Sequence, residues 1–411
     1  MMTRRIALRA VALATVFALG GLATSAPAQQ TRPLRVFVLA GQSNMQGHAH
    51  ARTVPSLELS PHTAPLLAKI LAADGSPRVY EGVRVASLGS SEEERVGALS
   101  IGFGADERGP KLGPELGFGI AMHERSEGPI LLIKTAWGGK SLHTDFRPPS
   151  AGRYEFDAAQ LAAFAKEGKD QEAMRAEKDA ATGRSYRAMI DYVRSILADL
   201  PRVVPGYDAE RGYELAGFVW FQGWNDMVDG GAYPRRGEPG GYDAYSEVLG
   251  HLIRDVRKDL AAPELPFVIG VLGVGGPVEL YPPDQKRYVA IHESFRKAME
   301  APASWPEFRG KVVAVRTETC WDQEVAALRL RERELQPELR RLEEERKAGR
   351  LRAEEANAAR AKLRAATFTP RELRLLDESV SNAEYHYLGS ARILVPIGVA
   401  FAEALLDLQK R

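Results

Sequence analysis

The sequence predicts an α/β domain in which helices cover both faces of a mostly parallel sheet. Five short runs rich in Val, Ile, Leu and Phe are apolar without interruption, as expected of strands buried on both faces. Amphipathic helical patterns lie between the runs, and an alternation of strands and helices is typical of the α/β class. The runs span residues 34–39, 130–135, 215–221, 267–274 and 312–316, and the clearest helical patterns span 186–200 and 245–260.

Length and composition allow one large catalytic domain with insertions, or two domains of ordinary size. The 411 residues carry a formal net charge of +1, which gives no field that would favour nucleic acid or an anionic membrane. Hydrophobic residues make up 45% of the chain, enough to bury a sizeable core. Cys320 is the single cysteine, so no intramolecular disulfide can form and the fold must rest on that core.

Residues 1–28 have the composition of a secretory signal peptide. Two arginines at positions 4 and 5 precede a mostly apolar run over 6–22, and Ala26-Pro27-Ala28 offers small residues for cleavage after Ala28. The sequence therefore predicts export to the periplasm or the cell exterior. The alternative is an uncleaved membrane anchor, but the apolar run is short for a bilayer span. The paired arginines also resemble a twin-arginine signal, which leaves the export route open.

Three stretches look like insertions into the domain. Residues 151–183 are charged and Ala-rich, which predicts peripheral helices, and residues 229–243 are rich in Gly and Pro, which predicts a loop over the site. Residues 323–367 are dominated by Arg, Glu, Leu and Ala and predict a long helix or a helical hairpin that turns near 348–350. Pro337 would kink or break that helix. The charged stretch is interpreted as a solvated arm, with a partner-binding arm as the alternative.

Polar and glycine-rich residues follow every predicted strand. In open parallel sheets, ligands bind outside the carboxyl ends of the strands. The sequence therefore predicts a binding or catalytic site at this edge of the sheet. The five blocks are Gly41-Gln42-Ser43, Trp137-Gly138-Gly139-Lys140-Ser141, Gln222-Gly223-Trp224-Asn225-Asp226, Gly273-Val274-Gly275-Gly276 and Thr319-Cys320-Trp321-Asp322.

Ser43 is the candidate nucleophile because it stands directly after a buried strand and before a predicted helix. A serine hydrolase needs an exposed hydroxyl, a base within hydrogen-bond reach and donors aimed at the developing oxyanion. Taken alone, Ser43 is better explained as a helix N-cap than as a nucleophile. Gly138-Gly139 allows close approach of backbone to a ligand, and Asn225 offers a side-chain N–H of the kind that binds oxyanions.

His386 is the candidate base among the eight histidines. It lies in a polar loop that leads into an apolar helix predicted over residues 393–406. Three other histidines lie near the predicted site and are candidates for substrate binding: His48, His50 and His143. The remaining four are interpreted as surface or packing residues: His62, His123, His251 and His292.

Four blocks of the sequence resemble the SGNH-type hydrolases, and within them the sialate O-acetylesterase-like group related to carbohydrate esterase family 6. They occur in the expected order between residues 35 and 405, and the first is the most specific. They are the nucleophile block Gly41-Gln42-Ser43-Asn44-Met45, the glycine block Trp137-Gly138-Gly139-Lys140-Ser141, the block Gly223-Trp224-Asn225-Asp226 and the histidine block His386-Tyr387-Leu388-Gly389.

The resemblance implies a doubly wound, flavodoxin-like α/β/α sandwich with a mostly parallel sheet of about five strands, over residues 33–410. It implies that Ser43 attacks the ester carbonyl and that His386 transfers the proton to the leaving alcohol. The oxyanion would be held by the Ser43 N–H, by a glycine N–H of Gly138 or Gly139, and by the Asn225 amide. The implied substrates are O-acetyl esters of carbohydrates, including sialic acid and plant polysaccharide, and no metal or organic cofactor is implied.

One position departs from the family pattern, because Ala383 stands where an Asp is often found three residues before the histidine. The group that orients His386 is therefore open between Asp322, Glu384 and a backbone carbonyl. Two alternatives to a carbohydrate acetylesterase also remain: a non-catalytic glycan-binding protein on an esterase scaffold, and an esterase for lipid or aryl esters. The residues predicted to line the substrate cleft are Gln42, Trp137, Lys140, Gln222 and Trp224.

Overall fold

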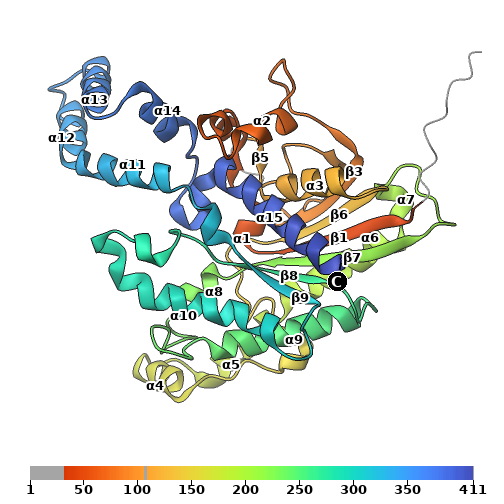
Figure 1. Cartoon of the computed structure of the whole chain (residues 1–411). Coiled ribbons are helices and arrows are strands. Elements are labelled where there is room, and N and C mark those ends of the chain that lie inside the picture. The colour runs from red at the N-terminus through yellow and green to blue at the C-terminus, as the bar shows by residue number, and fades with distance from the viewer. Residues whose placement is uncertain (1–31, 106–108, 411) are drawn as a thin grey trace, which may run out of the picture. The chain divides into compact units, whose positions relative to one another are not determined.

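The computed structural model describes residues 32–105 and 109–410, so the predicted signal peptide lies outside the described residues. Its centre is a seven-stranded sheet in the order β4-β3-β6-β1-β7-β8-β9 (Figure 1). Strand β4 is antiparallel to β3, and all other neighbours are parallel. The strands are β1 (Leu34–Gly41), β3 (Tyr80–Gly89), β4 (Arg95–Leu99), β6 (Ile130–Ala136), β7 (Tyr213–Phe221), β8 (Phe267–Val271) and β9 (Val312–Arg316).

The expected α/β class with a mostly parallel sheet is confirmed, but the sheet has seven strands where about five were expected. The five apolar runs form β1, β6, β7, β8 and β9, and the two missed strands are the edge pair β3 and β4. Charged residues interrupt both strands, and the first three residues of β3 and the first four residues of β4 are partly or fully exposed. An antiparallel edge with one face toward water does not produce a continuous apolar run.

Helices cover both faces of the sheet and make it the middle of three layers (Figure 1). On one face α3 (Pro114–Arg125) and α15 (Ala391–Gln409) pack together, and the other face carries α6 (Arg184–Ala198), α9 (Asp243–Asp259) and α10 (Val289–Glu300). Neighbouring residues of β7 point to opposite faces of the sheet. Phe221 packs on Phe401 of α15 with ring centres 5.3 Å apart, whereas Trp220 packs on Phe146 at 5.0 Å.

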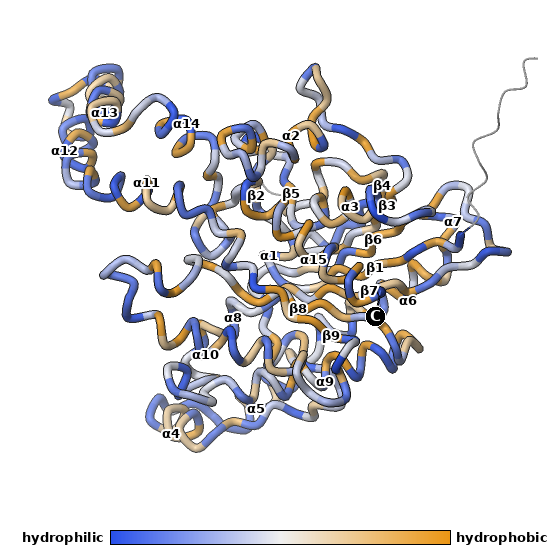
Figure 2. Tube along the Cα trace, in the orientation of Figure 1, coloured by the Kyte–Doolittle hydropathy of each residue, from blue (hydrophilic) through white to orange (hydrophobic). Residues whose placement is uncertain are grey.

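The two charged insertions are helical and lie at the periphery. Residues 151–183 contain α4 (Ala158–Lys166) and α5 (Gln171–Ala181). Residues 323–367 contain α11 (Gln323–Glu334), α12 (Gln336–Lys347) and α13 (Ala353–Thr367). The break before α12 coincides with Pro337 in its first turn, and the turn before α13 contains Gly349 at φ +72°. Figure 2 shows α12 as mainly hydrophilic, in contrast to the hydrophobic central strands.

No helix in the described part of the chain is both long enough and apolar enough to cross a membrane.

A buried ion pair joins the sheet to the helix next to the predicted nucleophile. The ammonium of Lys134, on β6, lies 2.6 Å from the Glu115 carboxylate of α3, and both side chains are almost fully buried. The same ammonium donates to the backbone carbonyl of Gln46 at 2.8 Å. Gln46 ends the short helix α1 (Ser43–Gln46), so this ion pair fixes that helix against the sheet.

Glu115→Ala should lower the free energy of unfolding by about 3–5 kcal/mol, because it leaves the Lys134 charge buried without its carboxylate. Glu124→Ala is the matched control, since Glu124 lies on the same helix and pairs with Lys69 at the surface. Its loss should cost less than about 1 kcal/mol. Urea unfolding measures both values. Equal losses in the two variants would show that the buried pair has no special role.

Candidate active site

Ser43 lies at the carboxyl end of β1, where the strand turns sharply into α1. Gly41 has φ +155°, and a Cβ there would lie 2.2 Å from the carbonyl oxygen of Phe221, so only glycine allows this turn. Gln42 is the N-cap residue of α1 and Ser43 is its first residue. Among the described residues, the Ser43 hydroxyl makes no capping hydrogen bond, and its one hydrogen-bond partner is Gln42 Nε2 at 3.5 Å. The structure therefore does not support the N-cap interpretation of Ser43.

The side chain of Gln42 fixes the orientation of Asn225. The Gln42 carbonyl oxygen accepts from the Gly223 N–H at 2.9 Å, which leaves Gln42 Nε2 to donate to Asn225 Oδ1 at 2.9 Å. Because the Asn225 oxygen is occupied in this way, its Nδ2 is the part of the amide that remains available as a donor. Gln42 itself is fully buried and serves as a scaffold, so its predicted role in substrate binding is not supported.

The two glycines of the second block, Gly138 and Gly139, differ in the hydrogen bonding of their backbone N–H groups. The Gly138 N–H donates to Ser90 Oγ at 2.9 Å, a contact that no sequence pattern predicted. The Gly139 N–H has no hydrogen-bond partner among the described residues, and Gly139 adopts φ +72°. Of the two predicted oxyanion donors, Gly139 is therefore the one with a free N–H.

A buried carboxylate joins the glycine block to the Asn225 segment. Asp226 accepts hydrogen bonds from the backbone N–H groups of Leu142 and His143, from Gln222 Nε2 and from the Tyr233 hydroxyl, at 2.6–3.0 Å. Gln222 also donates to the Lys140 carbonyl at 3.0 Å and is buried. The predicted role of Gln222 in substrate binding is therefore not supported, because its amide group is used within the protein.

His386 is oriented by an amide and not by a carboxylate. Its Nδ1 lies 3.0 Å from Asn382 Oδ1, and the same oxygen accepts from the Ala383 N–H at 2.7 Å. The backbone donor requires an oxygen at that position, so His386 Nδ1 must carry the proton and Nε2 is left as the acceptor. This is the tautomer that a general base needs. Asn382 stands four residues before the histidine, outside the position where the family pattern places its acid.

Tyr387 anchors the loop that carries His386. Tyr387 and Leu388 have φ +53° and +59°, left-handed conformations that are strained for side chains of this size. The buried Tyr387 hydroxyl accepts from the Gly273 N–H at 2.8 Å and lies 2.7 Å from Thr317 Oγ1. These contacts connect the loop to the segments that follow β8 and β9.

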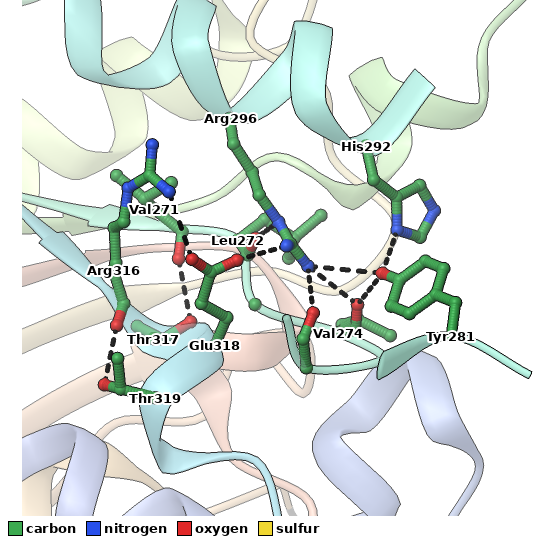
Figure 3. A network of polar contacts seen from close by, with 12 residues as sticks. Val271, Leu272, Val274, Tyr281, His292, Arg296, Arg316, Thr317, Glu318 and Thr319 are labelled. Carbon is green, nitrogen blue, oxygen red and sulfur yellow. Dashed lines mark hydrogen bonds and ion pairs between the residues drawn. The ribbon is translucent and has the colours of Figure 1, made fainter. Parts of the chain in front are cut away.

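The segments that receive Tyr387 are themselves fixed by Arg296 (Figure 3). The guanidinium of this α10 residue is buried and donates to the carbonyls of Leu272, Val274 and Gly276 at 2.9–3.1 Å. It also forms an ion pair with Glu318, directly after Thr317. Arg296 therefore positions the backbone against which the histidine loop rests.

Ser43 and His386 line the same cavity, which has a volume of about 520 Å³. No hydrogen bond joins the two side chains in this structure. None of the described lining residues is Asp or Glu. The lining residues that carry chemistry are Ser43, His48, His50, Arg52, Ser90, Lys111, Gly138, Gly139, Asn382 and His386.

Burial and positive charge lower the pKa of both stacked histidines. The rings of His48 and His386 are parallel, with centres 3.9 Å apart. Burial, with a smaller contribution from Lys111, lowers the pKa of His386 to about 4. Burial and the neighbouring His386 lower the pKa of His48 to about 3. Both rings are therefore neutral at physiological pH.

A family model described as carbohydrate esterase, sialic acid-specific acetylesterase matches residues 33–304. The chain belongs to this family. The Ser43, glycine and Asn225 blocks lie inside the matched range, and His386 lies beyond it. The comparison with curated proteins gives no match. No group of three or more metal-ligating side chains occurs among the residues that the structure covers.

Solved structures similar to this carbohydrate esterase include an Arabidopsis thaliana protein, with 14% identity, a TM-score of 0.41 and coverage of 91% of this chain and 98% of that chain. A carbohydrate acetylesterase from Xanthomonas citri is 18% identical, with a TM-score of 0.33 and coverage of 66% and 48%. NanS is 12% identical, with a TM-score of 0.36 and coverage of 71% and 78%. The family assignment rests on the match of residues 33–304 and not on these likenesses.

The two carboxylates proposed from the sequence lie elsewhere in this esterase. Asp322 forms a buried ion pair with Arg392 at 2.5 Å and caps α11 through the Val325 N–H. Glu384 lines a separate cavity beside α11. Neither has a contact with His386 in the described structure, because an arginine and a helix terminus already use the Asp322 carboxylate and Glu384 points to another cavity.

The predicted substrate-binding residues Trp137, Lys140 and Trp224 do not line the cavity that contains Ser43. Trp137 packs against the core, Lys140 forms an ion pair with Asp145 at 3.3 Å, and Trp224 packs on Tyr385 at 5.7 Å. Tyr385, which follows Glu384 in the histidine loop, is the aromatic residue that lines the cavity.

Tyr387→Phe should lower the free energy of unfolding by about 1–3 kcal/mol, because it leaves the Gly273 N–H and the Thr317 hydroxyl buried without their partner. Tyr385→Phe is the matched control, since Tyr385 is its neighbour and is 43% exposed. Its effect should stay within about 0.5 kcal/mol. Denaturant unfolding of the two variants checks this, and a similar small effect in both would contradict the anchoring role of Tyr387.

Proposed function

We propose that this carbohydrate acetylesterase is an exported serine esterase that removes O-acetyl groups from glycans through Ser43 and His386. Membership of the family makes the chain a carboxylic ester hydrolase with an acetylated carbohydrate substrate. The Ser–His mechanism and the export are the parts that we add. Export is motivated by the composition of residues 1–28, and N-terminal sequencing of the protein recovered outside the cytoplasm tests cleavage after Ala28.

One observation carries the mechanism: a serine hydroxyl, a histidine held with Nε2 unprotonated and a free backbone N–H line one cavity. These are the nucleophile, the base and an oxyanion donor that ester hydrolysis requires. Asn225 lies beside them, with its oxygen bonded to Gln42 and its Nδ2 available as a second donor. The Ser43 N–H, which has no partner among the described residues, supplies a third donor.

In the proposed reaction, Ser43 Oγ attacks the acetyl carbonyl carbon while His386 Nε2 takes the hydroxyl proton. The N–H groups of Ser43 and Gly139 and the Asn225 amide bind the negative oxygen of the tetrahedral intermediate. When the intermediate collapses, the carbon–oxygen bond to the sugar breaks and His386 returns the proton to the leaving sugar oxygen. A water molecule activated by His386 then cleaves acetyl-Ser43, which releases acetate and restores the serine.

Asn382 replaces the acid of a Ser–His–acid triad in this proposal. Its oxygen can hold the Nδ1 proton and fix the ring, but a neutral amide gives little electrostatic stabilisation to the imidazolium that forms during attack. The lowered pKa of His386 is consistent with that arrangement. We therefore assign Asn382 as the positioning residue, in place of Asp322 or Glu384.

Ser43→Ala should reduce acetate release from 4-nitrophenyl acetate and from acetylated sialic acid by roughly 10⁴–10⁶-fold. Asn225→Ala should reduce kcat by about 10²–10³-fold, the usual effect of losing one oxyanion donor. Ser304→Ala, at an exposed position outside the site, is the control and should match wild type.

Equal rates in wild type and Ser43→Ala would exclude Ser43 as the nucleophile. A wild-type protein that binds acetylated glycan but releases no acetate would instead be a binding protein. Faster cleavage of long acyl chains than of acetyl would indicate a lipid esterase.

The acidic limb of kcat/KM should lie near pH 4, because His386 acts as a base only when neutral and its pKa is about 4. Asn382→Asp should move this limb to higher pH, since a carboxylate beside Nδ1 favours the charged ring. Glu384→Gln should leave it in place. A wild-type limb near the ordinary histidine pKa of about 6.5, or an unshifted limb in Asn382→Asp, would contradict the assignment.

A further inference from the structure

A second cavity, of about 470 Å³, lies next to the oxyanion donors. Gly139 and Asn225 line it on one side, and Gly139 also lines the cavity that contains Ser43 and His386. The two cavities therefore meet at the point where the acetyl carbonyl is expected to bind. The volume of the second cavity falls within the range of about 300–1,000 Å³ that is usual for small-molecule sites.

The opposite wall of this second cavity comes from the insertion that contains α4 and α5. Phe156, Phe164 and Met174 line it with partly exposed side chains. Phe156 and Phe164 make an edge-to-face contact with ring centres 5.0 Å apart, and Tyr154 extends the aromatic row at 5.4 Å from Phe156. These aromatic side chains offer apolar surface of the kind that can pack against the C–H face of a pyranose ring.

The insertion that forms this wall is held in place at both of its ends. The Arg147 guanidinium donates to the carbonyls of Gly152 at 2.8 Å and of Ala151 at 2.9 Å. At its end, the Gly183 N–H donates to the Thr144 carbonyl at 2.8 Å. Both ends of the insertion are thus bonded to the loop that follows the glycine block.

Polar side chains with hydrogen-bonding capacity left over line the second cavity. The Lys178 ammonium lies 4.1 Å from the centre of the Tyr154 ring, and within the described part of the chain it has no hydrogen bond and no carboxylate partner. Asp229 contacts His143 Nε2 at 3.1 Å, and Asp145 and Glu177 also line the cavity. The lining therefore combines an ammonium donor with several carboxylate acceptors.

We propose that this cavity is a subsite for an uncharged sugar unit of the glycan that carries the acetyl group. The proposal rests on the proposed function and deepens it. Carboxylates outnumber the single lysine in the lining, which disfavours an anionic sugar, while carboxylate acceptors and an ammonium donor suit the hydroxyl groups of a neutral one. Since the cavities meet at Gly139, a glycan can extend from one into the other, and the enzyme should prefer linked sugar residues over free ones.

The test compares O-acetylated sialic acid in its free form with the same residue linked to lactose. Wild type, Phe164→Ala and Lys178→Met are measured on both substrates and on 4-nitrophenyl acetate. Lys169→Met is the matched control, because Lys169 belongs to the same insertion and pairs with Glu167 at the surface. Calorimetric binding of deacetylated sialyllactose and of free sialic acid gives a readout that does not depend on catalysis.

Wild type is expected to favour the linked substrate in kcat/KM by at least about tenfold, and Phe164→Ala and Lys178→Met should remove most of that preference. Their rates on the free sugar and on 4-nitrophenyl acetate should stay close to wild type. The same kcat/KM of wild type on the free and on the linked substrate would overturn the subsite. It would also be overturned if Phe164→Ala and Lys178→Met lost the same fraction of kcat/KM on every substrate.

Failure of wild type to cleave 4-nitrophenyl acetate would instead count against the proposed function. Calorimetry would then still decide the subsite: tighter binding of sialyllactose than of free sialic acid, lost in Lys178→Met and kept in Lys169→Met, supports it. Equal binding of the two sugars contradicts it.

Discussion

The carboxyl ends of β1 and β7 are joined by buried polar side chains, and the arrangement of the proposed oxyanion donors depends on them. Gln42 connects the Gly223 backbone to the Asn225 side chain, and Asp226 gathers four donors from the loop after β6 and from its own segment. A buried donor or acceptor that loses its partner costs about 1–3 kcal/mol. The same hydrogen bonds therefore stabilise this edge of the sheet and orient the proposed oxyanion donors.

The loop that carries His386 contains strained backbone, which a buried tyrosine hydroxyl holds in place. Two consecutive residues after His386 adopt left-handed backbone conformations, which L-amino acids with large side chains avoid at a cost of about 1–3 kcal/mol each. The Tyr387 hydroxyl offsets that strain through its contacts with Gly273 and Thr317, and Arg296 holds the backbone on which those contacts depend. Strands β8 and β9 therefore position His386, the proposed base, although their own residues are not among the described residues that line the cavity.

The sequence was sufficient for the fold class and for the order of the blocks, because buried parallel strands leave uninterrupted apolar runs and the site lies where those runs end. Ser43, Gly139 and His386 do line one cavity. Gln42 and Gln222 were predicted to line the substrate cleft, but their amide groups bond within the protein. A polar residue after a strand has the same appearance in sequence whether it contacts substrate or fastens one loop to another. Asn382 was missed because its role depends on a turn with φ values near +55° that no residue pattern predicted.

The neutral Asn382 amide beside His386 affects which groups stabilise the transition state in the proposed mechanism. A carboxylate at that position would raise the basicity of the ring, whereas Asn382 is neutral and burial, with a smaller contribution from Lys111, lowers the pKa of His386 to about 4. In the proposed mechanism, a weak base accepts the serine proton less readily, so more of the transition-state stabilisation has to come from the groups that bind the oxyanion. Three N–H donors are proposed for that role: the backbone N–H groups of Ser43 and Gly139, and the Asn225 amide, whose oxygen is already bonded to Gln42.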